Sequence, residues 1–191
     1  MKKIFVALLL VSINSFTYAQ TDFDEKKAIN SQIEYQIDML DYHLAYLLNK
    51  ETNDNIKADH IDAALELFIE NGISIRTENN EKLVNPSRIE FIDEHTGFKK
   101  SYPVNYLKTL PNFLQNKKKI KVQQARIYIL KILKKVSIDE CEASLECMTY
   151  PKDLNQGCSI SKTEIVRIPQ IRDIQGRKYY IYFGDIQVVV R

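Results

Sequence analysis

LELFIENGISIRT, residues 65–77, contains the point at which the chain changes from helical to strand-like periodicity. The apolar residues before this point recur at helical spacing: Ile61, Ala64, Leu65, Phe68 and Ile69. Asn71-Gly72 is a strong stop signal, because glycine readily adopts the left-handed conformation in which many helices end. Ile73 to Thr77 then alternates between apolar and polar residues, which is typical of a strand. The order of helix followed by strand predicts an α+β protein.

Towards the amino terminus, a longer helix is expected. Its apolar residues follow steps of three and four and would line one face: Ile29, Ile33, Ile37, Leu40, Leu44 and Leu47. Asp22 or Asp24 can cap the start of this helix, and the polar break 49–55 separates it from the next one.

Towards the carboxyl terminus, the pattern is mainly that of strands. Alternation predicts strands over 88–92, 163–172 and 177–190, with a turn at 173–176 between the last two. Ser101-Tyr102-Pro103 opens a short helix in which Val104, Leu107 and Leu110 face inward. Residues 119–138 fit helical spacing at several apolar positions, but their high content of β-branched residues favours a long strand.

The first 19 residues have the features of a secretory signal peptide. Lys2 and Lys3 precede an apolar run of about ten residues, and Thr17 and Ala19 are small residues placed for cleavage. The run is too short to span a bilayer, which needs roughly twenty residues. We therefore expect a signal peptide over 1–19, a single α+β domain over 20–191, and a periplasmic or secreted location.

Charge is distributed unevenly along the chain. The whole chain has 27 basic and 25 acidic residues, and Lys2 and Lys3 account for the difference. Residues 20–95 contain 17 acidic and 7 basic residues, whereas 96–191 contain 8 and 18. In an exported protein, a basic stretch favours an anionic glycan, a lipid headgroup or an acidic partner over nucleic acid. The candidate anion or partner surface comprises Lys117, Lys118, Lys119 and Lys121. Alternatively, the acidic half covers the basic half within one fold.

Three stretches resemble exported members of the nuclear-transport-factor-2-like superfamily. LELFIENGISIRT (65–77) is similar to the second helix running into the first strand, SYPVNYLKTLPNFL (101–114) to the short third helix, and YYIYFGDIQVVV (179–190) to the final strand. The resemblance implies two or three amino-terminal helices packed on a curved antiparallel sheet, forming a cone with a pocket. The superfamily includes enzymes and non-enzymatic binding proteins. No catalytic set matches by motif, so no catalytic residue is carried over.

The candidate ligand-binding residues are histidines and tyrosines. Tyr42, His43 and Tyr46 lie on the first helix off its aliphatic face, and they could face a ligand together with Tyr180 or Tyr182. Half-buried tyrosines that pack a ring and keep the hydroxyl in water explain the same pattern. His43 or His60 could act as an acid or base. No histidine has the i, i+4 partner of a helix-borne metal site, so neither a metal nor a cofactor is expected.

The three cysteines, Cys141, Cys147 and Cys158, all lie within 20 residues. In an oxidising compartment a disulfide is expected. A hairpin centred on Lys152-Asp153 would place Cys147 opposite Cys158, and this disulfide would contribute about 3 kcal/mol. Cys141–Cys158 is the alternative pairing. In the first case Cys141 is left either buried and inert or paired with another chain.

No phosphate-binding glycine loop, nucleophile elbow or metalloprotease motif is found in the sequence. These observations favour a non-enzymatic binding protein of the cell envelope, for a small ligand or a protein partner. The alternatives are a small-molecule enzyme that uses the cone pocket and a structural homodimer.

Overall fold

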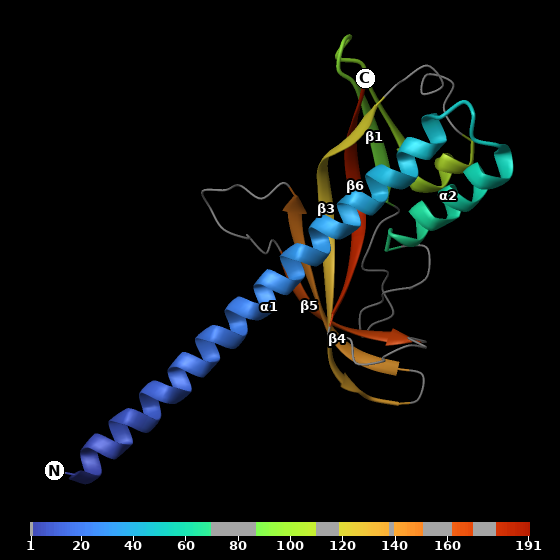
Figure 1. Ribbon diagram of the computed structural model, residues 1–191. Coiled ribbons are helices and arrows are strands. Elements are labelled where there is room, and N and C mark those ends of the chain that lie inside the picture. The colour runs from blue at the N-terminus through green and yellow to red at the C-terminus, as the bar shows by residue number, and fades with distance from the viewer. Residues whose placement is uncertain (1, 70–86, 110–118, 138–139, 151–161, 170–178) are drawn as a thin grey trace. The chain divides into compact units, whose positions relative to one another are not determined.

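The computed structural model describes residues 2–69, 87–109, 119–137, 140–150, 162–169 and 179–191 (Figure 1). The chain divides into two units, residues 1–36 and 37–191. Helix α1 runs from Lys2 to Leu48, so residues 2–36 of the first unit are helical. No helix in the described part of the chain is long and apolar enough to cross a membrane. Cleavage after residue 19 is not tested and stays a prediction.

The second unit contains the end of α1 and the helix α2, Asp54–Glu66. Asn53 caps α2 by accepting a hydrogen bond from the backbone N–H of Ile56 at 2.9 Å. The predicted apolar faces are confirmed where they fall in this unit. The buried residues are Ile37, Leu40, Leu44 and Leu47 in α1, and Ile61, Ala64 and Leu65 in α2.

The second helix ends earlier than its apolar pattern predicts. Phe68 forms a parallel bridge with Phe183 instead of continuing the helix. The backbone N–H of Phe183 donates to the carbonyl of Leu67 at 2.8 Å, and the N–H of Ile69 donates to the carbonyl of Phe183 at 3.0 Å. The two buried phenylalanine rings pack at 5.8 Å between centroids. Asn71-Gly72 and the strand predicted over 73–77 lie outside the described residues.

In the part of the chain that the structure describes, six strands form one sheet with the order β2-β1-β6-β3-β4-β5. Their bounds are β1 Arg88–Asp93, β2 Lys99–Pro103, β3 Ile120–Lys135, β4 Glu140–Tyr150, β5 Lys162–Pro169 and β6 Tyr179–Val190. The α+β class is thus confirmed, and 119–138 is mainly strand as favoured. One feature differs from the predicted antiparallel sheet, because β1 pairs parallel with β6. The sheet is therefore mixed.

A 3-10 helix, η1 (Val104–Thr109), follows β2 and lies beside α2. Val104 and Leu107 are buried as predicted, while Leu110 lies outside the described residues. The core contains large buried side chains from both helices and strands: Leu40, Leu44, Leu65, Phe68, Ile89, Phe91, Leu107, Ile127 and Phe183. A further cluster joins Ile69 to strand residues Leu130, Ala143, Leu145, Val166 and Ile168.

Candidate functional site

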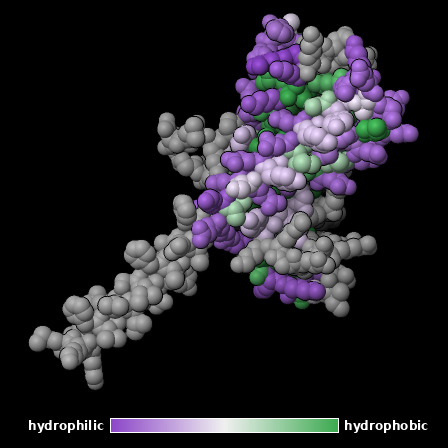
Figure 2. Space-filling model, in the orientation of Figure 1, coloured by the Kyte–Doolittle hydropathy of each residue, from purple (hydrophilic) through white to green (hydrophobic). Residues whose placement is uncertain are grey.

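A groove of about 680 Å³ lies where β3 begins and β6 ends; we call it the strand-end groove. It is lined by Asp41, Ala45, Glu94, Lys119, Ile120, Lys121, Val122, Gln123, Tyr150, Val189 and Arg191. In this region of the molecule, Figure 2 shows apolar surface bordered by hydrophilic surface. The volume lies within the roughly 300–1,000 Å³ that is typical of small-molecule sites.

Antiparallel pairing of β3 with β6 assembles the basic side of this groove. Lys121 is opposite Val189, and Ile120 is opposite Val190. Just beyond the strands, the backbones of Lys119 and Arg191 exchange two hydrogen bonds, at 2.9 and 3.2 Å. Three cations that are separated by up to 72 positions in the sequence are thereby brought to one end of the sheet.

The three cations differ in their partners. The guanidinium of Arg191 donates to the Glu94 carboxylate at 2.6 Å and contacts its second oxygen, which lowers the pKa of Glu94. Lys119 and Lys121 are exposed and form no salt bridge with any residue that the structure describes. Both lysines line the groove, and the charge of Lys121 also acts on Asp41.

Asp41 is the groove residue with an unusual environment. Its carboxylate accepts a hydrogen bond from the backbone N–H of Val122 at 2.7 Å. Burial raises the pKa of Asp41, and the Val122 hydrogen bond and the nearby charge of Lys121 only partly oppose this effect. A half-buried carboxyl with a raised pKa in a groove is a candidate proton donor or acceptor.

A second group of titratable side chains joins α1 to α2. His43 and His60 approach each other with 2.8 Å between their Nδ1 atoms. The Tyr46 ring stacks on His60 at 4.0 Å between centroids, and the Tyr42 ring makes T-shaped contacts with His43 and Tyr46. Burial, and then the neighbouring His60, lower the pKa of His43. In such a contact one ring nitrogen carries a proton and the other accepts through its lone pair, so one of the two rings donates a hydrogen bond to the other.

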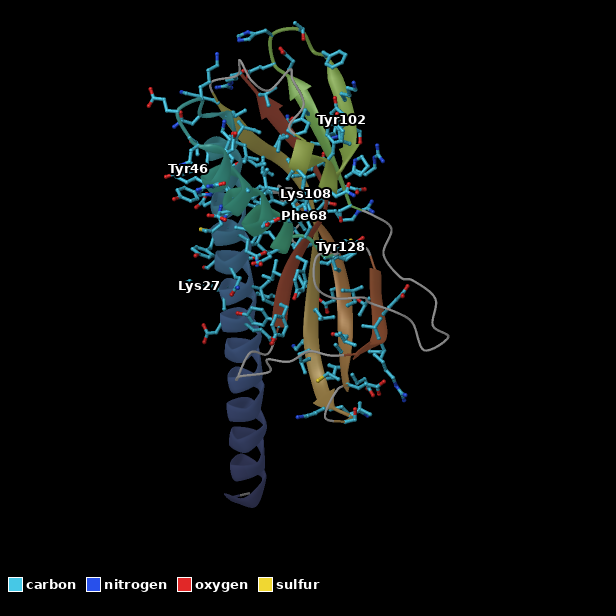
Figure 3. The ribbon with its side chains drawn as sticks, turned by 90° about the vertical axis from the view of Figure 1, so that its right-hand side faces the viewer. Lys27, Tyr46, Phe68, Tyr102, Lys108 and Tyr128 are labelled. Atoms are coloured by element: carbon cyan, nitrogen blue, oxygen red, sulfur yellow. The ribbon has the colours of Figure 1, made fainter. Side chains whose placement is uncertain are left out.

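The structure divides the five predicted ligand residues into two groups. Tyr42, His43 and Tyr46 lie together, as expected from their helical spacing. Tyr180 and Tyr182 instead pack against the strand cluster around Leu130. Figure 3 shows Tyr46 beside the helices and Tyr128, which is opposite Tyr182 in the sheet, among the strands. His60, which lies in the middle of α2, completes the helical group; the sequence indicated it only as a possible acid or base.

Two of the four candidate surface lysines, Lys119 and Lys121, line the strand-end groove. Lys117 and Lys118 lie outside the described residues. The candidate anion or partner surface therefore overlaps the wall of the strand-end groove, and this wall also contains carboxylates.

The register of β4 and β5 differs from the hairpin predicted around the cysteines. Cys147 of β4 is opposite Lys162 of β5, and not opposite Cys158 as the predicted hairpin required. Cys158 lies outside the described residues, so the Cys147–Cys158 disulfide stays a prediction. The alternative Cys141–Cys158 pairing does not agree with the structure, in which Cys141 is not bonded. Cys141 is buried at 2% exposure and is a free thiol. Its burial agrees with the inert alternative rather than with a bond to another chain.

Within the described residues, no group of three or more histidine, cysteine, aspartate or glutamate side chains is placed to hold a metal ion. No protein-family model and no curated protein matches this chain. Among solved structures, a "Putative Scytalone Dehydratase" from Novosphingobium aromaticivorans is similar over 91% of this chain and 88% of its own, with 11% identity and a TM-score of 0.28. A similarity of this size does not assign the chain to a family.

Proposed function

We propose that this chain is an exported binding protein of the cell envelope, and that its ligand occupies the strand-end groove. The ligand is an amphipathic small molecule with an anionic group. The observation that supports this most directly is the combination of apolar lining with Lys119 and Lys121, whose ammonium groups form no salt bridge with the residues that the structure describes.

Each part of the ligand has a counterpart in the groove. Ile120, Val122 and Val189 supply apolar surface, and burying an apolar group there is favourable in proportion to its area. Lys119 and Lys121 supply two positive charges at one end of the sheet, which would orient the anionic group. Because both ammonium groups are exposed, their attraction is screened by salt, and affinity should fall as ionic strength rises.

The test uses anilinonaphthalene sulfonate, an aromatic sulfonate that becomes fluorescent on transfer to an apolar site. We expect the Lys119→Ala/Lys121→Ala variant to bind it roughly tenfold more weakly than the wild type, because two exposed charge contacts are lost. Lys99→Ala/Lys135→Ala removes the same charge at exposed positions outside the groove and should bind like the wild type. Equal affinity in all three proteins would remove the groove from consideration.

Asp41 supports a second candidate, a small-molecule enzyme that uses this carboxyl as its acid or base. Its place in the groove and its raised pKa are the features expected of such a group. Chemical conversion of a bound compound by the wild type but not by Asp41→Asn would favour this candidate. Release of the compound unchanged by both proteins would favour the binding protein.

A further inference from the structure

The sheet also has a groove of about 270 Å³ that is separate from the strand-end groove; we call it the polar-face groove. It is lined by Arg88, Glu90, Ser101, Gln124, Arg126, Thr149, Asp185, Ile186 and Gln187. No residue lines both grooves.

Strand pairing aligns these polar side chains into rows across the sheet. In one row, Glu90 lies between Ser101 of β2 and Gln187 of β6, and Gln187 is opposite Gln124 of β3. In the next row, Arg126 of β3 is opposite Thr149 of β4. On β1, the polar residues alternate with the buried Ile89 and Phe91, so the rows lie on the face away from this part of the core.

The long side chains are held by their neighbours. Arg88 donates from Nε to the Ser101 hydroxyl at 2.9 Å and from Nη2 to the Ser101 carbonyl at 3.1 Å. Arg126 hydrogen-bonds to Tyr128, and its guanidinium lies 4.0 Å from Asp185. Gln187 donates to Glu90 at 2.7 Å. These contacts restrain part of the donor and acceptor arrangement before any ligand arrives.

Other groups in the groove retain hydrogen-bonding capacity. The Gln124 amide and the Thr149 hydroxyl have no hydrogen-bond partner among the described residues, and the Gln187 amide uses one of its N–H groups on Glu90. The charges balance, since two arginines face two carboxylates. A neutral ligand with many donors and acceptors satisfies such a lining, whereas an anion would meet the carboxylates and a cation the guanidinium groups.

We infer that the polar-face groove binds a neutral saccharide. A sugar carries hydroxyl groups that both donate and accept, which matches the mixture of amide, hydroxyl, guanidinium and carboxylate groups. The groove is somewhat smaller than the roughly 300–1,000 Å³ of drug-sized sites, which suits one or two sugar rings. The inference is independent of the ligand of the strand-end groove.

The test is a titration of the isotopically labelled protein with cellobiose and, separately, with diacetylchitobiose, followed by amide chemical shifts. We expect shifts at residues 88–90, 124–126 and 185–187 with at least one of the two sugars, and no competition with anilinonaphthalene sulfonate. In Gln124→Ala/Thr149→Val the affinity should fall roughly tenfold, because two hydrogen bonds to the sugar are lost. Neither side chain has a hydrogen-bond partner among the residues that the structure describes, so this variant should remain as stable as the wild type.

Gln123→Ala is the matched control, because this neighbouring glutamine lines the other groove. It should leave sugar binding unchanged. Shifts with neither sugar would overturn the inference, as would equal sugar affinity in Gln124→Ala/Thr149→Val and the wild type. Concentration-dependent shifts of the same residues without sugar would identify this face as a contact between two copies of the chain and would equally overturn it.

Discussion

At the residue scale, Asp41 and His43 illustrate two different effects of partial burial. Both residues lie near the end of α1, within three positions of each other. The Asp41 carboxylate accepts a hydrogen bond from a strand backbone, whereas the His43 imidazole pairs with a second imidazole. Burial raises the pKa of the acid and lowers that of the base, because in both cases it disfavours the charged form. Each effect gives a prediction that can be measured without knowing the ligand.

Asp41→Ala should destabilise the protein by about 1–3 kcal/mol, because it leaves the N–H of the buried Val122 without its acceptor. Asp41→Asn retains an acceptor oxygen and removes a charge that burial disfavours, so it should be close to neutral at pH 7. Urea unfolding of both variants makes the comparison. Equal destabilisation by the two substitutions would show that the charge, and not the hydrogen bond, is what the fold requires.

The His43–His60 pair should make the protein less stable in acid. The pKa of His43 is lower in the folded state than its usual value near 6.5, so between these two values the unfolded chain binds more protons. The stabilising contribution of the neutral pair is therefore complete above pH 6.5 and decreases as the pH falls towards the folded pKa.

Unfolding free energies measured from pH 7.5 to 5 would test this expectation. The decrease below pH 6.5 should be smaller in His43→Gln than in the wild type, whereas His95→Gln, an exposed turn residue, should behave like the wild type. Identical pH profiles for all three proteins would contradict the role assigned to the pair.

At the scale of elements, strand β3 shows why its sequence is ambiguous. Val122 and Ala125 are both buried although they are three positions apart, which is a helical interval. The register between β3 and β6 shifts at 122–124 and again at 125–127, so extra residues interrupt the strict alternation of a strand. β-branched composition predicted the strand correctly, but periodicity could not, because bulges imitate a helical step.

β3 and β6 approach each other so closely at one glycine that a side chain would not fit there without a shift. A Cβ atom at Gly184 would lie 2.6 Å from Cε2 of the Tyr128 ring and 3.3 Å from its Cδ2. We expect Gly184→Ala to destabilise the protein by about 1–3 kcal/mol through overpacking.

A double-mutant cycle measured by thermal or urea unfolding would identify the cause. If the ring is the obstacle, Gly184→Ala should cost much less in a Tyr128→Leu background. An undiminished cost in that background would place the effect in the backbone instead.

At the scale of the whole molecule, the sequence predicted the α+β class and the approximate positions of α2, β1, β3, β5 and β6, since periodicity and composition are local properties. The helix expected to open at Ser101-Tyr102-Pro103 was wrong at its start, because these residues belong to β2 and the 3-10 helix begins only at Val104. It did not predict the parallel pairing of β1 with β6 or the early end of α2, because both depend on partners far along the chain. The strand-end groove could not be predicted from the sequence for the same reason, because Lys119 and Arg191 are neighbours only through strand register.

The structure also explains part of the uneven distribution of acidic and basic residues along the chain. Among the described residues, the salt bridges of Lys108 with Asp62 and of Arg191 with Glu94 connect the acidic half to the basic half. Exposed pairs of this kind contribute little stability individually. Lys119 and Lys121 are different in that they border a groove without a salt bridge among the described residues, and the proposed function depends on this difference.

The most direct measurement is a native mass spectrum of the protein recovered from the envelope of its own cells, for the wild type and for Lys119→Ala/Lys121→Ala. We predict that the wild type carries an added mass that disappears on denaturation, and that the variant carries little or none of it. The denatured mass should correspond to a chain that begins at Gln20. The same added mass on both proteins, or none on either, would contradict a ligand held by the two lysines of the strand-end groove.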